Sequence, residues 1–112
     1  MYAFPKSARL RTQVEIDRVF KEGARFSCKG MRVHVLRTEM QGNRAAFIAV
    51  RSFPGAVERN RAKRLAREAW RHLMPELLPG HDCVFVLYPG MTAFSECRGA
   101  MQYLLRKAAV LR

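Results

Sequence analysis

A run of basic residues, VERNRAKRLAREAWR at positions 57–71, holds the side chains whose types and spacing could bind a ligand. Six of the chain's 21 Lys and Arg residues lie within it. Guanidinium groups make forked hydrogen bonds with phosphates, so several of them on one helix would bind a polyanion. A DNA groove, a membrane surface, a folded RNA and plain solvent are the environments to be distinguished.

Side chains for catalysis by the protein are sparse. The nine Asp and Glu residues form none of the D-x-D or H-x-D sets that hold Mg²⁺ or Mn²⁺. His81 and Cys83 are two positions apart, but no second pair completes a zinc site. Glu58 and Glu68 lie among arginines and are interpreted as ion-pair partners. We therefore predict no catalytic residue and no metal ligand in this chain.

Composition favours a nucleic-acid partner. A chain of 112 residues, 49% of them hydrophobic, is expected to fold as one domain over residues 1–112. Its net charge of +12 is a large excess, which usually serves to meet a polyanion. Three cysteines without a C-x-x-C pair predict free thiols, with Cys83 and Cys97 in the core, and a cytoplasmic location. No signal peptide and no membrane span are expected, because no apolar run approaches the required length of about 18 residues.

The hydrophobic pattern predicts seven elements. Thr12 with Glu15 fits a capping box, and Gly23 fits a left-handed helix stop. Alternating apolar residues indicate half-buried strands, and the nearly continuous apolar run after Arg44 indicates a central strand. The predicted order is helix 13–22, short strand 25–27, strand 31–36, strand 44–53, helix 57–73, strand 81–89 and helix 95–112. This order predicts an α+β domain in which one sheet is packed by helices.

The helix over 57–73 is predicted to be amphipathic, with an apolar arc for packing on the sheet and Trp70 at its border. The apolar arc contains Ala62, Leu65, Ala66, Ala69 and Leu73. A neighbouring basic arc contains Arg59, Asn60, Lys63, Arg64, Arg67 and Arg71, while Arg61 points elsewhere.

Three of the four environments fit this helix poorly. A helix-turn-helix needs a helix directly before the reading helix, but a strand is predicted there. A membrane-surface helix needs exposed bulky apolar residues, whereas this arc is mostly Ala and Leu. Plain solvent does not offset like charges four positions apart, which cost about 0.2–0.5 kcal/mol per pair. A folded or single-stranded nucleic acid remains, with Phe20, His34 and Phe47 as candidates for stacking on bases.

The basic run closely resembles the signature helix of the bacterial ribonuclease P protein family, R-N-R-x-K-R-x-x-R-x-x-[FW]. The pattern is filled here by Arg59, Asn60, Arg61, Lys63, Arg64, Arg67 and Trp70. RLRTQVEIDRVFKEG, at 9–23, is similar to the first helix of that family. DCVFVLYPG and the terminal LLRK fall where the family places its last strand and helix, so the resemblance covers essentially the whole chain.

The resemblance implies a ribosomal protein S5 domain 2-like fold, in the order α-β-β-β-α-β-α with a left-handed β-α-β crossover. It also implies the accessory subunit of a ribonucleoprotein endonuclease that removes the 5′ leader from precursor tRNA, with one protein monomer per RNA. The RNA subunit would hold the catalytic Mg²⁺, so no cofactor is expected on the protein. A general RNA-binding or ribosome-associated structural protein on the same fold is the alternative.

Two binding surfaces follow from the resemblance. The RNA subunit would contact Arg59, Asn60, Arg61, Lys63, Arg64, Arg67 and Arg71. The 5′ leader would lie in a cleft with Phe20, Ile16, His34, Arg51 and Phe47. Arg9 and Arg11 would act from a flexible basic tail over residues 1–11.

This chain departs from the family pattern in both surfaces. Ile16 and His34 stand where aromatic residues are common in the family, which predicts weaker or differently tuned stacking on the leader. The loop 51–57 before the basic helix has Arg51 as its only cation, where the family usually has a lysine pair.

Overall fold

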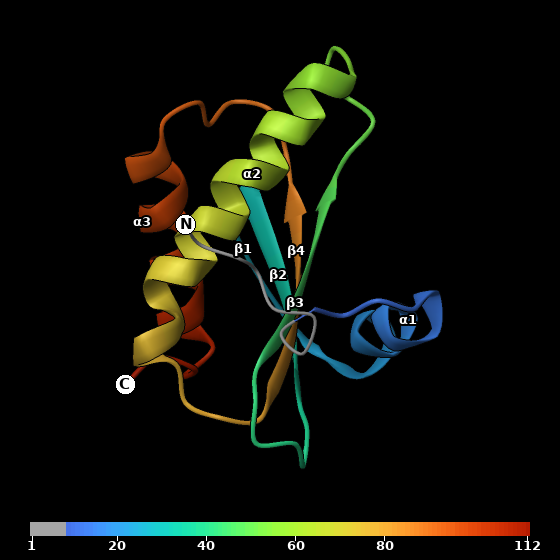
Figure 1. The fold of residues 1–112 in the computed structure, drawn as a ribbon, viewed down its shortest axis with the longest axis vertical. Coiled ribbons are helices and arrows are strands. Elements are labelled where there is room, and N and C mark those ends of the chain that lie inside the picture. Colours follow the sequence, from blue (N-terminus) through green and yellow to red (C-terminus); the bar gives the residue numbers. More distant parts are fainter. Residues whose placement is uncertain (1–8) are drawn as a thin grey trace.

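Four strands form one sheet, and three α-helices pack on its two faces within residues 9–112, the part of the chain that the computed structural model describes (Figure 1). The elements are α1 (Gln13–Glu22), β1 (Ala24–Cys28), β2 (Met31–Arg37), β3 (Arg44–Ala49), α2 (Ala56–Leu73), a short 3-10 turn (Met74–Glu76), β4 (His81–Leu87) and α3 (Phe94–Lys107). This confirms the predicted order and the α+β class. None of the described helices is long and apolar enough to cross a bilayer.

The strand order in the sheet is β1-β2-β4-β3. β2 pairs antiparallel with β1 and β4, whereas β3 lies parallel to β4, so α2 makes the crossover between the two parallel strands. The prediction that β3 is central is wrong: β4 is central and β3 lies at the edge. β3 is apolar because an apolar cluster lies on each of its faces, with Ala45 packed in the cluster on the α2 side and Ala46 in the cluster on the α1 side.

Each face of the sheet has its own apolar cluster. α2 and α3 cover one face (Figure 1), where Trp70 is fully buried and packs edge-on against Phe85 with ring centroids 5.7 Å apart. Cys83 and Cys97 are buried on this side, as predicted. α1 lies on the opposite face, where Val19 is buried. The sheet therefore separates the surroundings of α2 from those of α1.

α1 begins with the capping box predicted from the sequence, but it does not end with the predicted left-handed glycine. Thr12 Oγ1 accepts a hydrogen bond from the Glu15 backbone N–H at 3.1 Å, which completes the predicted capping box. Gly23 is in extended conformation, with φ −80° and ψ 157°, so the predicted left-handed stop is wrong. Glycine is needed for a different reason: a Cβ atom here would lie 2.6 Å from the Val19 carbonyl oxygen and 2.9 Å from that of Val35.

The segment before α1 is tied to the edge of the sheet. The Leu10 backbone N–H donates to the Ala45 carbonyl oxygen at 3.0 Å, and Arg9 forms a parallel bridge with Ala45. The Leu10 side chain is only 6% exposed. The prediction of a flexible tail is therefore wrong for Arg9 and Leu10, because an apolar anchor and a ladder bond hold them. Residues 1–8 lie outside the described residues.

Replacing Gly23 by alanine is expected to destabilise the protein by about 1–3 kcal/mol, because the new methyl group would overlap two backbone carbonyls that cannot move freely. Gly99→Ala is the matched control. Gly99 is exposed inside α3 with no atom within 4 Å of its would-be Cβ, so alanine should stabilise by about 0.5–1 kcal/mol. Urea unfolding of the two variants measures both effects, and equal stabilities would contradict the assignment of Gly23.

Candidate nucleic-acid interface

The predicted amphipathic character of α2 is confirmed. Its apolar arc faces the sheet and α3, with Ala66, Ala69 and Leu73 buried, and Trp70 lies fully inside rather than at the border. Cations spaced four residues apart, and therefore stacked along one side of the helix, form a ridge. This α2 ridge consists of Arg59, Lys63, Arg67 and Arg71, with Asn60 and Arg64 exposed beside it.

Only part of the charge on α2 is balanced within the protein. Arg71 pairs with Glu68, as predicted for that carboxylate, and Arg59 Nη1 donates to the Phe53 carbonyl oxygen at 3.3 Å. Within residues 9–112, no side-chain hydrogen bond or ion pair involves the four remaining cations. These are Arg61, Lys63, Arg64 and Arg67.

Arg61 points away from the ridge, as predicted. It lines a small pocket of about 180 Å³, together with Pro54 and Pro89 from the loops that follow β3 and β4. The cations of α2 therefore face two sides of the helix, and a ligand that binds all of them must wrap around its first turns.

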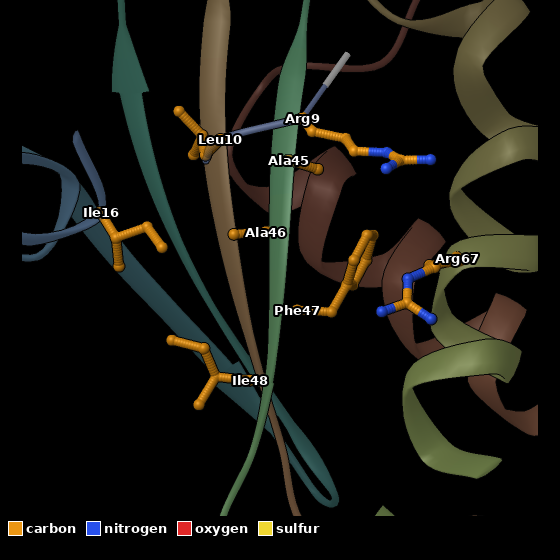
Figure 2. Close-up of a pocket in the computed structure, with 8 residues that line it drawn as sticks. All are labelled: Arg9, Leu10, Ile16, Ala45, Ala46, Phe47, Ile48 and Arg67. Atoms are coloured by element: carbon orange, nitrogen blue, oxygen red, sulfur yellow. The ribbon is translucent and has the colours of Figure 1, made fainter. Parts of the chain in front are cut away.

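A second cavity, of about 470 Å³, straddles the outer edge of β3 (Figure 2). On the α2 side of the strand, Arg9 and Arg67 both reach into it beside the Phe47 ring. On the other side, Ile16 and Ile48 line it. The edge of β3 thus joins the surroundings of α2 to those of α1, and cations from two distant segments lie on the α2 side.

The structure brings together three of the five residues predicted for the leader cleft. The Phe20 ring lies edge-on to the His34 imidazole, with centroids 4.7 Å apart, and Ile16 belongs to the same apolar cluster. Phe47 is not among them, because alternation along β3 turns its ring to the α2 side, where it stacks on Phe85 at 5.4 Å. Arg51 is exposed in the turn after β3, and no described ring contact, hydrogen bond or ion pair joins it to Phe20 or His34.

Three further residues near His34 were missed by the sequence reasoning. Arg25 is the cross-strand neighbour of His34 on β1, and Arg32 lies two positions before it on β2. The Arg32 guanidinium carbon lies 6.0 Å from the centre of the Tyr88 ring. We call Arg25, Arg32, His34 and Tyr88 the cationic sheet face. Strand alternation already placed Arg32 on the same side as His34, so that signal was available in the sequence.

His34 is neutral at physiological pH and has unused hydrogen-bonding capacity. Its side chain is buried, at 7% exposure, and neither ring nitrogen has a partner among the described residues. Burial lowers the pKa of His34, and the charges of Arg32 and Arg25 lower it further. A neutral imidazole can donate from one nitrogen and accept at the other. With Phe20 beside it, this residue could both hydrogen-bond and stack on an unpaired base.

Comparison with known proteins agrees with this geometry. The family model for ribonuclease P matches residues 4–109. The chain belongs to the ribonuclease P protein family. The ribonuclease P protein component of Roseiflexus castenholzii is 33% identical over 110 residues, covering 96% of this chain and 90% of that protein. That of Chloroflexus aurantiacus is 34% identical over 109 residues, covering 95% and 81% respectively.

Solved ribonuclease P proteins have the same fold. The protein from Staphylococcus aureus superposes with a TM-score of 0.85 at 19% identity, over 96% of this chain and all of that one (100%). The protein from Thermotoga maritima superposes with a TM-score of 0.80 at 26% identity, over 88% of this chain and 96% of that one. The arrangement of one sheet and three helices is therefore that of ribonuclease P proteins.

In this member of the ribonuclease P family, a three-residue ion-pair cluster joins α1 to the sheet. Arg44 on β3 donates from Nε and Nη2 to the two carboxylate oxygens of Asp82 on β4, at 2.9 and 2.7 Å. Its Nη1 donates to Glu15 Oε2 on α1 at 2.7 Å. We call Glu15, Arg44 and Asp82 the Arg44 clamp. Two of the nine carboxylates are thereby engaged by a guanidinium, and no group of three or more His, Cys, Asp and Glu side chains suited to a metal exists in the described chain.

The hydrogen bonds of the Arg44 clamp also shift the pKa values of Glu15 and Arg44. The hydrogen bond from Arg44, followed by that from the Thr12 backbone, lowers the pKa of Glu15 from 4.5 to about 2. The Asp82 and Glu15 carboxylates raise the pKa of Arg44. These hydrogen bonds favour the ionised forms of Glu15 and Arg44.

Glu15→Gln should therefore lose stability in a pH-dependent way. Because the pKa of Glu15 is lower in the folded protein, its charge stabilises the fold above pH 4.5, and this contribution disappears as the pH falls toward 2. Wild type should exceed the variant by about 1 kcal/mol at neutral pH, allowing for partial exposure of the pair. Urea unfolding across this range should show the gap closing in acid. Glu22→Gln, which removes only an exposed pair with Arg18, is the control and should show little gap at any pH.

Proposed function

We propose that this chain is the protein subunit of ribonuclease P, binding the catalytic RNA subunit and the 5′ leader of precursor tRNA. The unbalanced cations of α2 carry the proposal. Like charges four residues apart repel one another on a helix, and a row of phosphates offsets that cost. Family membership supplies the identity of the polyanion, and the helix anchored by Trp70 supplies a rigid surface for it.

The RNA subunit would bind along the α2 ridge and around the first turns of α2. Lys63, Arg64 and Arg67 would contact phosphates directly, because no acidic side chain of the described chain competes for them. Asn60 would add a neutral polar contact, and Arg61 would reach RNA on the adjacent side. Arg59 and Arg71 would contribute charge while held by Phe53 and Glu68. Arg9 lies beside Arg67 at the edge of β3 and would extend this surface, with Arg11 as the weaker candidate.

The leader would lie between α1 and the cationic sheet face. Phe20 would stack on a base and His34 would hydrogen-bond to it, with Ile16 as apolar support. Arg25 and Arg32 would bind leader phosphates, and Tyr88 offers a second aromatic surface. Phe47 is left out of this cleft, since its ring packs on the other side of the sheet.

Cleavage itself would be performed by the RNA subunit with its Mg²⁺. Glu15, Asp82 and Glu68 are paired with Arg44 and Arg71, and residues 9–112 contain no cluster of acidic side chains suited to a metal ion. The protein would raise the affinity for substrate and metal by neutralising phosphates, as a monomer bound to one RNA. Free thiols at Cys28, Cys83 and Cys97 suit the reducing cytoplasm.

A processing assay tests the proposal. Adding this protein to its cognate RNA subunit at low Mg²⁺ should increase the rate of 5′ leader removal by about tenfold or more, since it supplies positive charge that Mg²⁺ otherwise provides. No increase would contradict the proposal. Equal affinity for any structured RNA would favour a general RNA-binding protein, and cleavage by the protein without RNA would show a nuclease.

The α2 ridge is tested by the salt dependence of binding to the RNA subunit. Arg64→Ala with Arg67→Ala should weaken binding and reduce the slope of log affinity against log salt by about 1.4–1.8, since each lost phosphate contact removes about 0.7–0.9. Arg37→Ala with Arg106→Ala removes the same charge from exposed positions outside α2 and is the matched control. A slope that falls equally in both pairs would indicate net charge alone, and an unchanged slope in both would exclude α2 as the RNA surface.

A further inference from the structure

The position of α1 on the sheet is weakly determined by apolar packing alone. α1 has ten residues, too few for a helix to be stable in isolation. Val19 is its one buried residue, and Ile16 and Phe20 are half-buried beside it. This cluster is small, so apolar packing alone constrains the tilt of α1 on the sheet only weakly.

The Arg44 clamp supplies the missing direction. The planar guanidinium binds Asp82 through two parallel hydrogen bonds, which orient it relative to β3 and β4. Its remaining Nη1 binds Glu15 Oε2, while Glu15 Oε1 accepts from the backbone N–H groups of Arg11 and Thr12 at 3.3 Å each. The Glu15 carboxylate thus caps the start of α1 and also joins the helix to the sheet. The clamp ties the first turn of α1 to two strands that are distant in sequence.

Phe20 lies at the opposite end of α1, about 7.5 Å further along the helix axis at 1.5 Å per residue. Val19, the buried residue of α1, lies between Glu15 and Phe20 and packs on the sheet. Release of Glu15 would let α1 change its tilt on the sheet, and such a change would move the Phe20 ring relative to His34, which is 4.7 Å away between centroids. The clamp at one end therefore sets the geometry of the cleft at the other.

We propose that Arg44 is a positioning residue for leader recognition: it holds α1 at the tilt at which Phe20 and His34 together receive a single-stranded RNA. This inference rests on the proposed function. Arg44 itself need not touch RNA, because its three engaged nitrogens face carboxylates.

Arg44→Lys is the decisive variant, because lysine keeps the charge but cannot bind both carboxylates in a planar fork. Substrate affinity of the assembled ribonucleoprotein is measured with a leader of several nucleotides and with mature tRNA. Arg44→Lys should weaken the long-leader substrate about five- to tenfold and leave mature tRNA within about twofold. Binding of the protein to the RNA subunit should be unchanged, since α2 is not altered. In the free protein, the nuclear magnetic resonance shifts of the His34 ring should lose part of the ring-current contribution from Phe20.

Arg18→Lys is the matched control, because it alters an exposed pair with Glu22 on the same helix and should change none of these readings. Glu15→Gln provides a second variant that keeps Arg44 bound to Asp82, and it should give a smaller loss of the same kind. Equal losses for both substrates and for RNA-subunit binding would show a general folding role and overturn the inference. Wild-type leader preference retained in Arg44→Lys would also overturn it. Absence of leader preference in the wild type would instead contradict the proposed function.

Discussion

Packing of α2 on the sheet is the constraint on which the rest of the molecule depends. Two alanines, Ala66 and Ala69, let the helix approach closely, and Trp70 fills the space beside Phe85. Because close-packed side chains interlock, the helix cannot rotate about its axis. Every cation outside the apolar arc is therefore presented in a fixed direction. A cationic helix that could rotate about its axis would lose conformational entropy on binding RNA. In this protein, α2 has already lost that freedom on folding.

Alternation along the strands divides the protein into two sides with different tasks. Residues 47 and 48 are neighbours in the sequence, yet Phe47 faces α2 and Ile48 faces α1 (Figure 2). The α2 ridge and the cationic sheet face thus lie on opposite sides of one sheet, the latter on β1 and β2, far from the edge formed by β3. Such an arrangement lets one small domain contact a large folded RNA with one side and a single strand with the other, as the proposed function requires.

Local signals in the sequence were sufficient for the helices and for the faces of α2. The capping box at Thr12 and the apolar arc of α2 depend on residues within four positions of each other, and both are confirmed. The edge position of β3 was not predictable, because a strand with an apolar cluster on each face has the same apolar pattern as a central one. Gly23 was misjudged for a related reason: its constraint comes from the carbonyl of Val35, which only the tertiary fold brings near.

The members of the Arg44 clamp are far apart in the sequence. Arg44 is 29 positions from Glu15 and 38 from Asp82, so no local pattern could reveal the Arg44 clamp. The Arg44 clamp also reduces the number of carboxylates that are left to balance the other cations. The chain has only nine carboxylates against 21 Lys and Arg residues, and the clamp uses two of them for one guanidinium. Two acidic side chains are thus committed to fixing the architecture, and Lys63, Arg64 and Arg67 of α2 have no acidic partner among the described residues.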